Sequence, residues 1–366
     1  MKWSWRIGRI AGIDIFMHAT FLLLLLWVAV TESRAGGDRA AILGSIGFLL
    51  LLFASVVAHE YGHALTARRF GVRTRRITLL PIGGLAELER MPDDPKQELL
   101  IAAAGPAVTL LLVIVLAVAV QLSGMGYFVT SASAAVRLPI VVQLMWANVV
   151  LFLFNLLPAF PMDGGRMLRA GLAMRMSAVR ATDIASRVGK GFALLFGAVG
   201  LLYDPFLVFI ALFVWLGASG EAASTRFTSA LRNVPVEHVM VREYRTLGVD
   251  DQLDRAAGEL LTGFQRDFPV IDGRGEPVGI LSSTVLASAL HSRGRQARVG
   301  DVMQPIPTAA DPHEPLTVAY ARMREGRLRM LPVVYGGRLA GVLTADNVSE
   351  YVMLDAAIRS ARDRTA

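Results

Sequence analysis

The sequence predicts a polytopic α-helical membrane protein with about six transmembrane helices, followed by a smaller α/β domain. Hydrophobic residues make up 54% of the 366 residues and charged residues only 18%, whereas about a quarter of an ordinary soluble domain is charged. The apolar runs stop near Ala223, and the rest of the chain has a soluble composition. We therefore expect two domains in different solvents, residues 1–225 in the membrane and residues 226–366 outside it.

Six segments are apolar and long enough to be considered as membrane-spanning helices. They are Ile15–Thr31, Ala41–Thr66, Glu98–Leu122, Leu138–Leu157, Gly191–Tyr203 and Pro205–Ser219. The last two are short, so we expect a tight hairpin or a tilted pair. The first follows a basic start without a small-residue cleavage site, and we interpret it as a retained helix. His18, early in that helix, is expected to pack or to form a hydrogen bond.

Basic residues indicate the orientation of these helices. Lysines and arginines gather before the first segment, after the second (residues 68–76) and after the fourth (residues 166–190), whereas the opposite loops hold few. The positive-inside rule places the N-terminus, these loops and the C-terminal domain in the cytoplasm. Because the basic residues flank apolar segments and form no single stripe, the formal charge of +7 does not predict a nucleic-acid partner.

The loop after the second segment contains two short strand-like pieces. Ile77–Leu80 and Leu85–Leu88 flank Pro81 and the glycine pair at residues 83 and 84. This pattern predicts a hairpin or a re-entrant loop at the cytoplasmic face. An ordinary surface loop is the alternative that the sequence leaves open.

The soluble part contains an internal repeat with an offset of 62 to 63 residues. VEHVMV matches VGDVMQ, and FPVIDGRGEPVGILS matches LPVVYGGRLAGVLT. The copies span about residues 235–292 and 297–355, and each reads as strand, helix, two strands and helix. Two adjacent copies predict a pseudo-symmetric α/β pair. Residues Gly220 to Asn233 would be the linker that precedes it.

Two histidines and a glutamate lie inside the second apolar segment, in the sequence HEYGH. His59 and His63 are one helical turn apart, so their imidazoles project from one face and can bind the same metal ion. Glu60 is placed to take a proton from an attacking water molecule. The chain has no cysteine, which excludes thiolate ligands. The alternative is a chance match, although ionisable groups in a membrane helix usually have a function.

A catalytic zinc site needs a third protein ligand, and Asp163 is the best candidate. It follows an apolar helix and two prolines and precedes the glycines at residues 164 and 165. The prolines end the helix and the glycines permit a tight turn, so the carboxylate can be directed sideways. His59 and Asp163 both lie shortly before arginines of the same side. The alternative is that Asp163 caps the next helix.

These motifs resemble the site-2 protease family of intramembrane zinc metalloproteases. The resemblance rests on AHEYGHALTARRFGV, GGLAELER, AAAGPAVTL and FNLLPAFPMDGGRML. It implies that His59, His63 and Asp163 bind one zinc ion per chain and that Glu60 is the general base. It also implies that Asn155 stabilises the oxyanion, with a hydrogen bond between helices as the alternative. Gly105-Pro106, within AAAGPAVTL, is expected to permit close helix contact.

The C-terminal repeat resembles tandem CBS (cystathionine-β-synthase-type) modules, so the match is to the branch of the family that carries them. Such pairs often bind adenine nucleotides through a Thr or Ser and an Asp after a Gly-Ile or Gly-Val strand. The first copy has Ser282 but Val285 in place of the aspartate. The second has Thr344 and Asn347, with Asp346 one residue early, so at most one nucleotide site is expected. The alternative is a structural or dimerisation domain.

Together these features predict an intramembrane zinc endopeptidase that cleaves in or next to a transmembrane segment of a substrate protein. We expect a multi-pass protein of a bacterial plasma membrane, a single-pass membrane substrate, regulation by the CBS pair and homodimers formed through it. The rival prediction is a CBS-gated metal transporter or channel, in which the intramembrane His and Asp residues line an ion path. Glu60 would have no role in mere passage of an ion.

Overall fold

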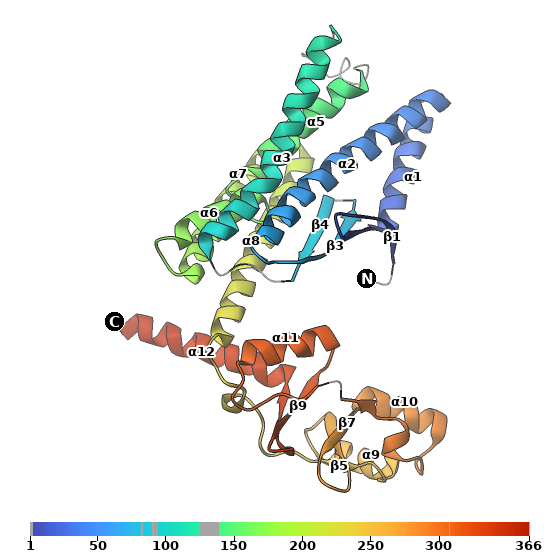
Figure 1. Ribbon diagram of the computed structural model, residues 1–366, viewed down its shortest axis with the longest axis vertical. Helices are drawn as coiled ribbons and strands as arrows, with labels where there is room; N and C mark the ends of the chain where they lie inside the picture. Colours follow the sequence, from blue (N-terminus) through green and yellow to red (C-terminus); the bar gives the residue numbers. More distant parts are fainter. Residues whose placement is uncertain are drawn as a thin grey trace. The chain divides into compact units, whose positions relative to one another are not determined.

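The computed structural model describes residues 3–81, 83–89, 92, 94–124, 139–306 and 308–365. The chain divides into two compact units, Met1–Thr225 and Arg226–Ala366. The first unit is mostly helical and the second is α/β (Figure 1).

The first unit contains seven helices within its described residues. They are α1 (Ala19–Arg34), α2 (Arg39–Arg69), α3 (Pro95–Leu122), α5 (Ile140–Asn155), α6 (Asp163–Ala173), α7 (Ala178–Leu202) and α8 (Pro205–Leu231). Among the described residues, α2, α3, α7 and α8 are long and apolar enough to cross a membrane, and α5 is a shorter apolar helix. These helices confirm the polytopic helical class. Six spans stay a prediction, and Leu138, the expected start of the fourth, lies outside the described residues.

The expected helix Ile15–Thr31 is wrong at its N-terminal end. The chain begins with strands β1 (Ser4–Ile10) and β2 (Ile13–His18), and α1 starts only at Ala19. Strand β2 pairs with β1 on one side and with β3 (Thr74–Leu80) on the other. The backbone N–H and C=O groups of β2 therefore find hydrogen-bond partners in the sheet. His18 lies before the helix, where its imidazole accepts a hydrogen bond from the Thr20 N–H at 3.3 Å.

The predicted hairpin after the second segment is confirmed. It consists of β3 and β4 (Gly83–Leu88), which pair antiparallel and complete a sheet of order β1-β2-β3-β4 (Figure 1). Gly83 begins β4 with φ of +136°, a conformation that favours glycine. Since β4 is at the edge of the sheet, one side of its backbone has no partner strand among the residues that the structure describes.

Helices pack closely where glycines face them. A Cβ atom on Gly62 of α2 would lie 2.6 Å from the Ala104 carbonyl oxygen of α3, so the two helices touch through backbone. Similarly, a Cβ atom on Gly217 of α8 would lie 2.6 Å from Pro161 Cδ. The second contact holds the turn that precedes α6 against α8.

A group of three charges, two of them buried, joins α3, α6 and α8. Arg169 Nε donates to Glu98 Oε1 at 2.7 Å, and the same guanidinium pairs with Glu221. Arg169 and Glu98 are each only 9% exposed. The boundary between the two units, after Thr225, falls within the expected linker Gly220–Asn233, but most of that stretch is helical, because α8 continues to Leu231. Nothing in that stretch interrupts a helix, since it contains neither proline nor an internal glycine after Gly220.

The described residues of the second unit form two large hydrophobic cores and a smaller third cluster. Its elements are η1 (Val236–His238), β5 (Leu247–Gly248), α9 (Leu253–Thr262), β6 (Asp267–Ile271), β7 (Pro277–Ser282), α10 (Ser283–Arg293), η2 (Val299–Asp301), β8 (Gln304–Pro305), α11 (Leu316–Gly326), β9 (Met330–Tyr335), β10 (Arg338–Thr344) and α12 (Ala345–Thr365). The first copy has the expected strand, helix, two strands and helix. In the second copy the first strand is reduced to a single bridge between Ala310 and Val333.

The buried charge group leads to a stability prediction. Arg169→Ala should leave Glu98 buried without its partner and destabilise the first unit by about 3 kcal/mol. Arg75→Ala is the control, because Arg75 and Glu89 are 3.9 Å apart and half-exposed, and such pairs contribute less than about 1 kcal/mol. Unfolding in detergent micelles measures both. Equal losses in the two variants would contradict the prediction.

Candidate metal centre

Helix α2 presents His59 and His63 on one face, one turn apart. Their side chains are almost fully buried, with 5% and 7% of the residue surface exposed. The chain forms a helix here because residues 41–65 are mostly apolar and contain no proline. Burial removes both imidazoles from solvent, so their polar atoms must be satisfied within the protein.

The turn between α5 and α6 brings Asp163 to the same place. Asp163 is the first residue of α6 and is 7% exposed, while Met162 occupies the N-cap position. A Cβ atom on Gly164 would lie 2.3 Å from the carbonyl oxygens of Leu156 and Leu157, so only glycine fits in this turn. The carboxylate is directed towards α2 and does not serve as the helix cap.

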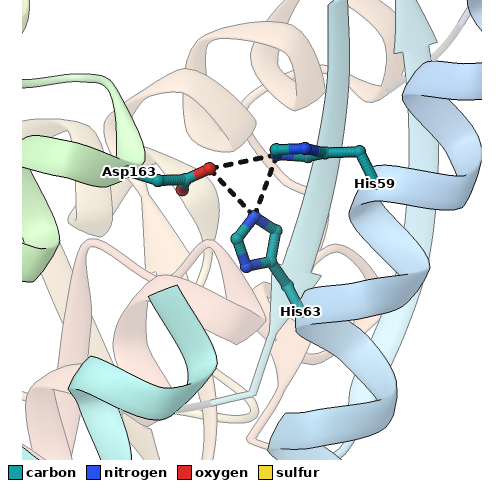
Figure 2. A group of neighbouring side chains, drawn as sticks. All are labelled: His59, His63 and Asp163. Carbon is teal, nitrogen blue, oxygen red and sulfur yellow. Dashed lines mark hydrogen bonds and ion pairs between the residues drawn. The ribbon is translucent and has the colours of Figure 1, made fainter. Parts of the chain in front are cut away.

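The three side chains form a small triangle of donor atoms (Figure 2). Asp163 Oδ2 lies 3.0 Å from His59 Nε2 and 3.1 Å from His63 Nε2, and the two Nε2 atoms are 3.1 Å apart. Ligands at about 2.0–2.1 Å from a tetrahedral zinc lie roughly 3.3 Å from each other. The triangle would therefore need to open by only a few tenths of an ångström, and these residues fit a metal site.

The Nδ1 atom of each imidazole points away from the triangle, and its hydrogen-bond partner indicates which ring nitrogen carries the proton. His63 Nδ1 lies 2.7 Å from the Ile101 carbonyl oxygen, which can only accept, so Nδ1 carries the proton. His59 Nδ1 lies 2.8 Å from Thr109 Oγ1. With Nδ1 protonated, each Nε2 presents a lone pair to the other and to the Asp163 carboxylate. Such acceptors, facing one another in an apolar interior, are stabilised by a metal ion between them or by a proton on one of the rings.

A cavity of about 340 Å³ opens beside this triangle. Its lining includes Glu60, Asn155, Arg166 and the edge strand β4. A Cβ atom on Gly84 would lie 2.7 Å from Glu60 Cγ, so β4 runs directly past the glutamate. The Asn155 amide donates to the Leu151 carbonyl of its own helix at 3.0 Å, and no bond to another helix is found for it among the described residues. The cavity thus brings a carboxylate, an amide and an open strand edge to the triangle.

The residues predicted for nucleotide binding lie in the second unit, at the start of α12. The Asn347 N–H donates to Thr344 Oγ1 at 3.1 Å, and the Thr344 hydroxyl contacts the Asn347 side chain. Asp346 is exposed beside them. In the first copy, Ser282 Oγ likewise accepts from the Val285 N–H at 3.3 Å. These hydroxyls cap helices in both copies, which is the structural role that Thr and Ser commonly take.

Sequence reasoning missed what α3 contributes. Gly105 was expected to permit helix contact, yet a Cβ atom there would lie 2.2 Å from His63 Nε2 and 2.7 Å from His59 Nε2. Thr109 was not considered, although it is fully buried and bonded to His59. The available signal was the four-residue spacing of Ile101, Gly105 and Thr109, which places them on one helix face.

Comparisons with known proteins match both parts of the chain. The model of peptidase family M50 matches residues 47–138 and 124–196, and that of the CBS domain matches residues 236–292 and 299–354. The zinc metalloprotease MJ0392 of Methanocaldococcus jannaschii is 30% identical over 353 residues, covering 95% of this chain and 96% of that protein. Rip3 of Mycobacterium tuberculosis is 34% identical over 379 residues, covering 94% and 92%. A solved site-2 protease from M. jannaschii is 37% identical and covers 60% of this chain and 95% of its own, with a TM-score of 0.45.

Because a Cβ atom does not fit at Gly105, adding one methyl group there should disturb metal binding. Gly105→Ala should displace the imidazoles and lower the metal content of the purified protein severalfold, as measured by elemental analysis. Alanine favours a helix over glycine by about 1 kcal/mol, so a loss of metal would not reflect a weaker helix. Gly44→Ala in α2 is the control, because its Cβ would meet nothing within 4 Å. Full metal content in Gly105→Ala would refute this explanation.

Proposed function

The chain belongs to peptidase family M50, the site-2 proteases, and from this premise we propose that His59, His63 and Asp163 hold one zinc ion and that Glu60 is the general base. The protein is a zinc metalloendopeptidase of the site-2 protease type and a multi-pass membrane protein. The observation that carries the ligand assignment is the convergence of three buried acceptor atoms within 3.0–3.1 Å. It accounts for ionisable groups in an apolar helix, since a divalent cation satisfies all three.

The chain's own residues supply the remaining chemistry. A zinc ion held there would supply the Lewis acidity that makes water nucleophilic at neutral pH. Glu60 follows the first ligand directly and lines the cavity, so its carboxylate is available to accept the proton of an attacking water. After attack it can pass that proton to the amine of the leaving peptide. The site needs no other acid–base group for one round of hydrolysis.

Asn155 is proposed to stabilise the developing oxyanion. It lines the same cavity as Glu60 and Asp163 and ends α5 just before the ligand turn. Its amide donates to Leu151, and one of its two N–H groups remains available for a substrate oxygen. A donor fixed at the rim of the site can hold negative charge without reorganisation.

The substrate is a membrane protein, as expected for an intramembrane protease, and we propose that it is single-pass. The open edge of β4 lines the cavity through Gly83 and Gly84, next to Glu60. An unwound substrate segment could add to this edge as a further strand, so that main-chain hydrogen bonds hold it in extended form. We propose cleavage in or beside a transmembrane segment, with water entering from the cytoplasmic side.

We propose that residues 1–225 form the protease domain and that residues 226–366 are a cytoplasmic CBS domain that regulates it. The basic flanks of the apolar segments support a cytoplasmic N-terminus and CBS domain in a bacterial plasma membrane. An adenine nucleotide would bind at Thr344, Asp346 and Asn347 of the second copy. Homodimers through the CBS domain are a further part of this proposal. The rival metal transporter is not retained, because the family membership identifies an enzyme.

The general base provides the sharpest test of the mechanism. Glu60→Gln should lower the cleavage rate by about a hundredfold or more, because an amide cannot accept the proton, while zinc stays bound. His59→Ala should lose both activity and zinc. Proteoliposomes containing a tagged single-pass substrate give the rate, and elemental analysis gives the zinc content. If Glu60→Gln cleaves as fast as the parent, the proposed mechanism is wrong.

Nucleotide binding is tested on the full-length protein. Titration with ATP and AMP should reveal one site per chain, and Asp346→Ala should weaken it. Ser282→Ala in the first copy is the matched control and should leave the affinity unchanged. Absence of binding at millimolar nucleotide would favour the structural or dimerisation role for the CBS pair.

A further inference from the structure

Helix α3 contributes no ligand to the metal centre, yet one of its faces determines how the imidazoles are held. Ile101, Gly105 and Thr109 follow one another at four-residue spacing, so they lie in a row along the helix. Ile101 accepts a hydrogen bond from His63, Gly105 leaves room for both rings, and Thr109 contacts His59. We propose that Thr109 is a positioning residue of the zinc site, which fixes the tautomer and orientation of His59.

The hydrogen bonds of the Thr109 hydroxyl determine its role towards His59. Oγ1 lies 3.3 Å from the Gly105 carbonyl oxygen, one turn earlier in the same helix, and donates its single proton there. The Oγ1 lone pairs then face the His59 Nδ1 atom 2.8 Å away, and they accept its proton in the tautomer that a ligand bound through Nε2 requires. The lone pair of His59 is thereby placed on Nε2, the atom that lies 3.0 Å from Asp163.

The surroundings hold this arrangement rigidly. Thr109 has none of its surface exposed, so no solvent competes for its hydroxyl. A threonine whose hydroxyl bonds to the carbonyl of the preceding turn is confined to few rotamers within a helix. His63 receives the equivalent support from a backbone carbonyl, which no substitution can remove. Of the two groups that contact the imidazole Nδ1 atoms, only the Thr109 hydroxyl can therefore be removed by mutation.

Removing the hydroxyl should weaken zinc binding without removing a ligand. In Thr109→Val the shape is kept, but the His59 Nδ1–H would be buried without a partner. Moving the proton to Nε2, or rotating the ring, would lower the free energy of this unpaired group. Either change turns the Nε2 lone pair away from the centre. Loss of such supporting groups typically lowers metal affinity by about 10–100-fold.

The experiment compares Thr109→Val with Thr109→Ser in purified full-length protein. Zinc affinity is measured by competition with a chelator, and thermal unfolding is measured in the metal-free state. Valine should weaken zinc binding by about 10–100-fold, whereas serine, which keeps the hydroxyl, should restore most of the affinity. Thr182→Val is the matched control, because Thr182 is buried and its hydroxyl bonds to the Ala178 carbonyl of its own helix.

The inference rests on the proposed ligand set, and His59→Ala separates the two. If His59→Ala binds zinc like the parent, the ligand assignment fails. If His59→Ala loses zinc while Thr109→Val binds it like the parent, only the role of Thr109 is overturned. A merely structural role would lower the unfolding temperature of metal-free Thr109→Val and leave its zinc affinity unchanged.

A measurement on the parent protein keeps the inference testable should the valine variant fail to fold. Nitrogen-15 solid-state NMR of histidine-labelled, zinc-bound protein in lipid reports which ring nitrogen carries a proton and which binds the metal. We expect the two metal-bound rings, His59 and His63, to carry a proton on Nδ1 and to bind zinc through Nε2. A metal-bound ring with its proton on Nε2 would overturn the inference.

Discussion

Three hydrogen-bond acceptors directed at one another in an apolar interior are unfavourable unless a metal ion or a proton lies between them. His59, His63 and Asp163 are in that situation, with their polar atoms 3.0–3.1 Å apart and almost no exposed surface. Much of the first unit serves to keep them there. Two residues come from one turn of α2, and the third comes from a turn 100 residues after His63. The triangle of donor atoms therefore depends on the packing of helices that are distant in sequence.

Glycines make that packing possible at particular positions. Gly62 lets α2 touch the α3 backbone, Gly105 leaves the volume beside both imidazoles, and Gly164 lets the ligand turn close. Gly217 then supports Pro161 from α8. At each point a methyl group would fall within 2.7 Å of another atom. The distances among the three donor atoms therefore depend on where side chains are absent as well as on where they are present.

The sequence predicted the features that depend on local spacing. Histidines four residues apart in an apolar helix specify a shared face, and prolines followed by two glycines specify a tight turn at Asp163. It did not predict β2, because a short apolar strand and the start of an apolar helix have the same composition. The role of Thr109 could not be predicted from the sequence either, because Thr109 and His59 are 50 positions apart in the chain. Only the structure shows which strands pair over long distances in the sequence and which helix faces contact each other.

The continuity of α8 has a consequence for how the protein can be dissected. This helix runs from Pro205 to Leu231, and its last turns, with Phe227 and Leu231, belong to a hydrophobic core of the second unit. A soluble fragment cut at Arg232 would discard both side chains and leave that core open to solvent. An expression boundary placed before Phe227, within the helix and not after it, would preserve a cooperatively folding piece.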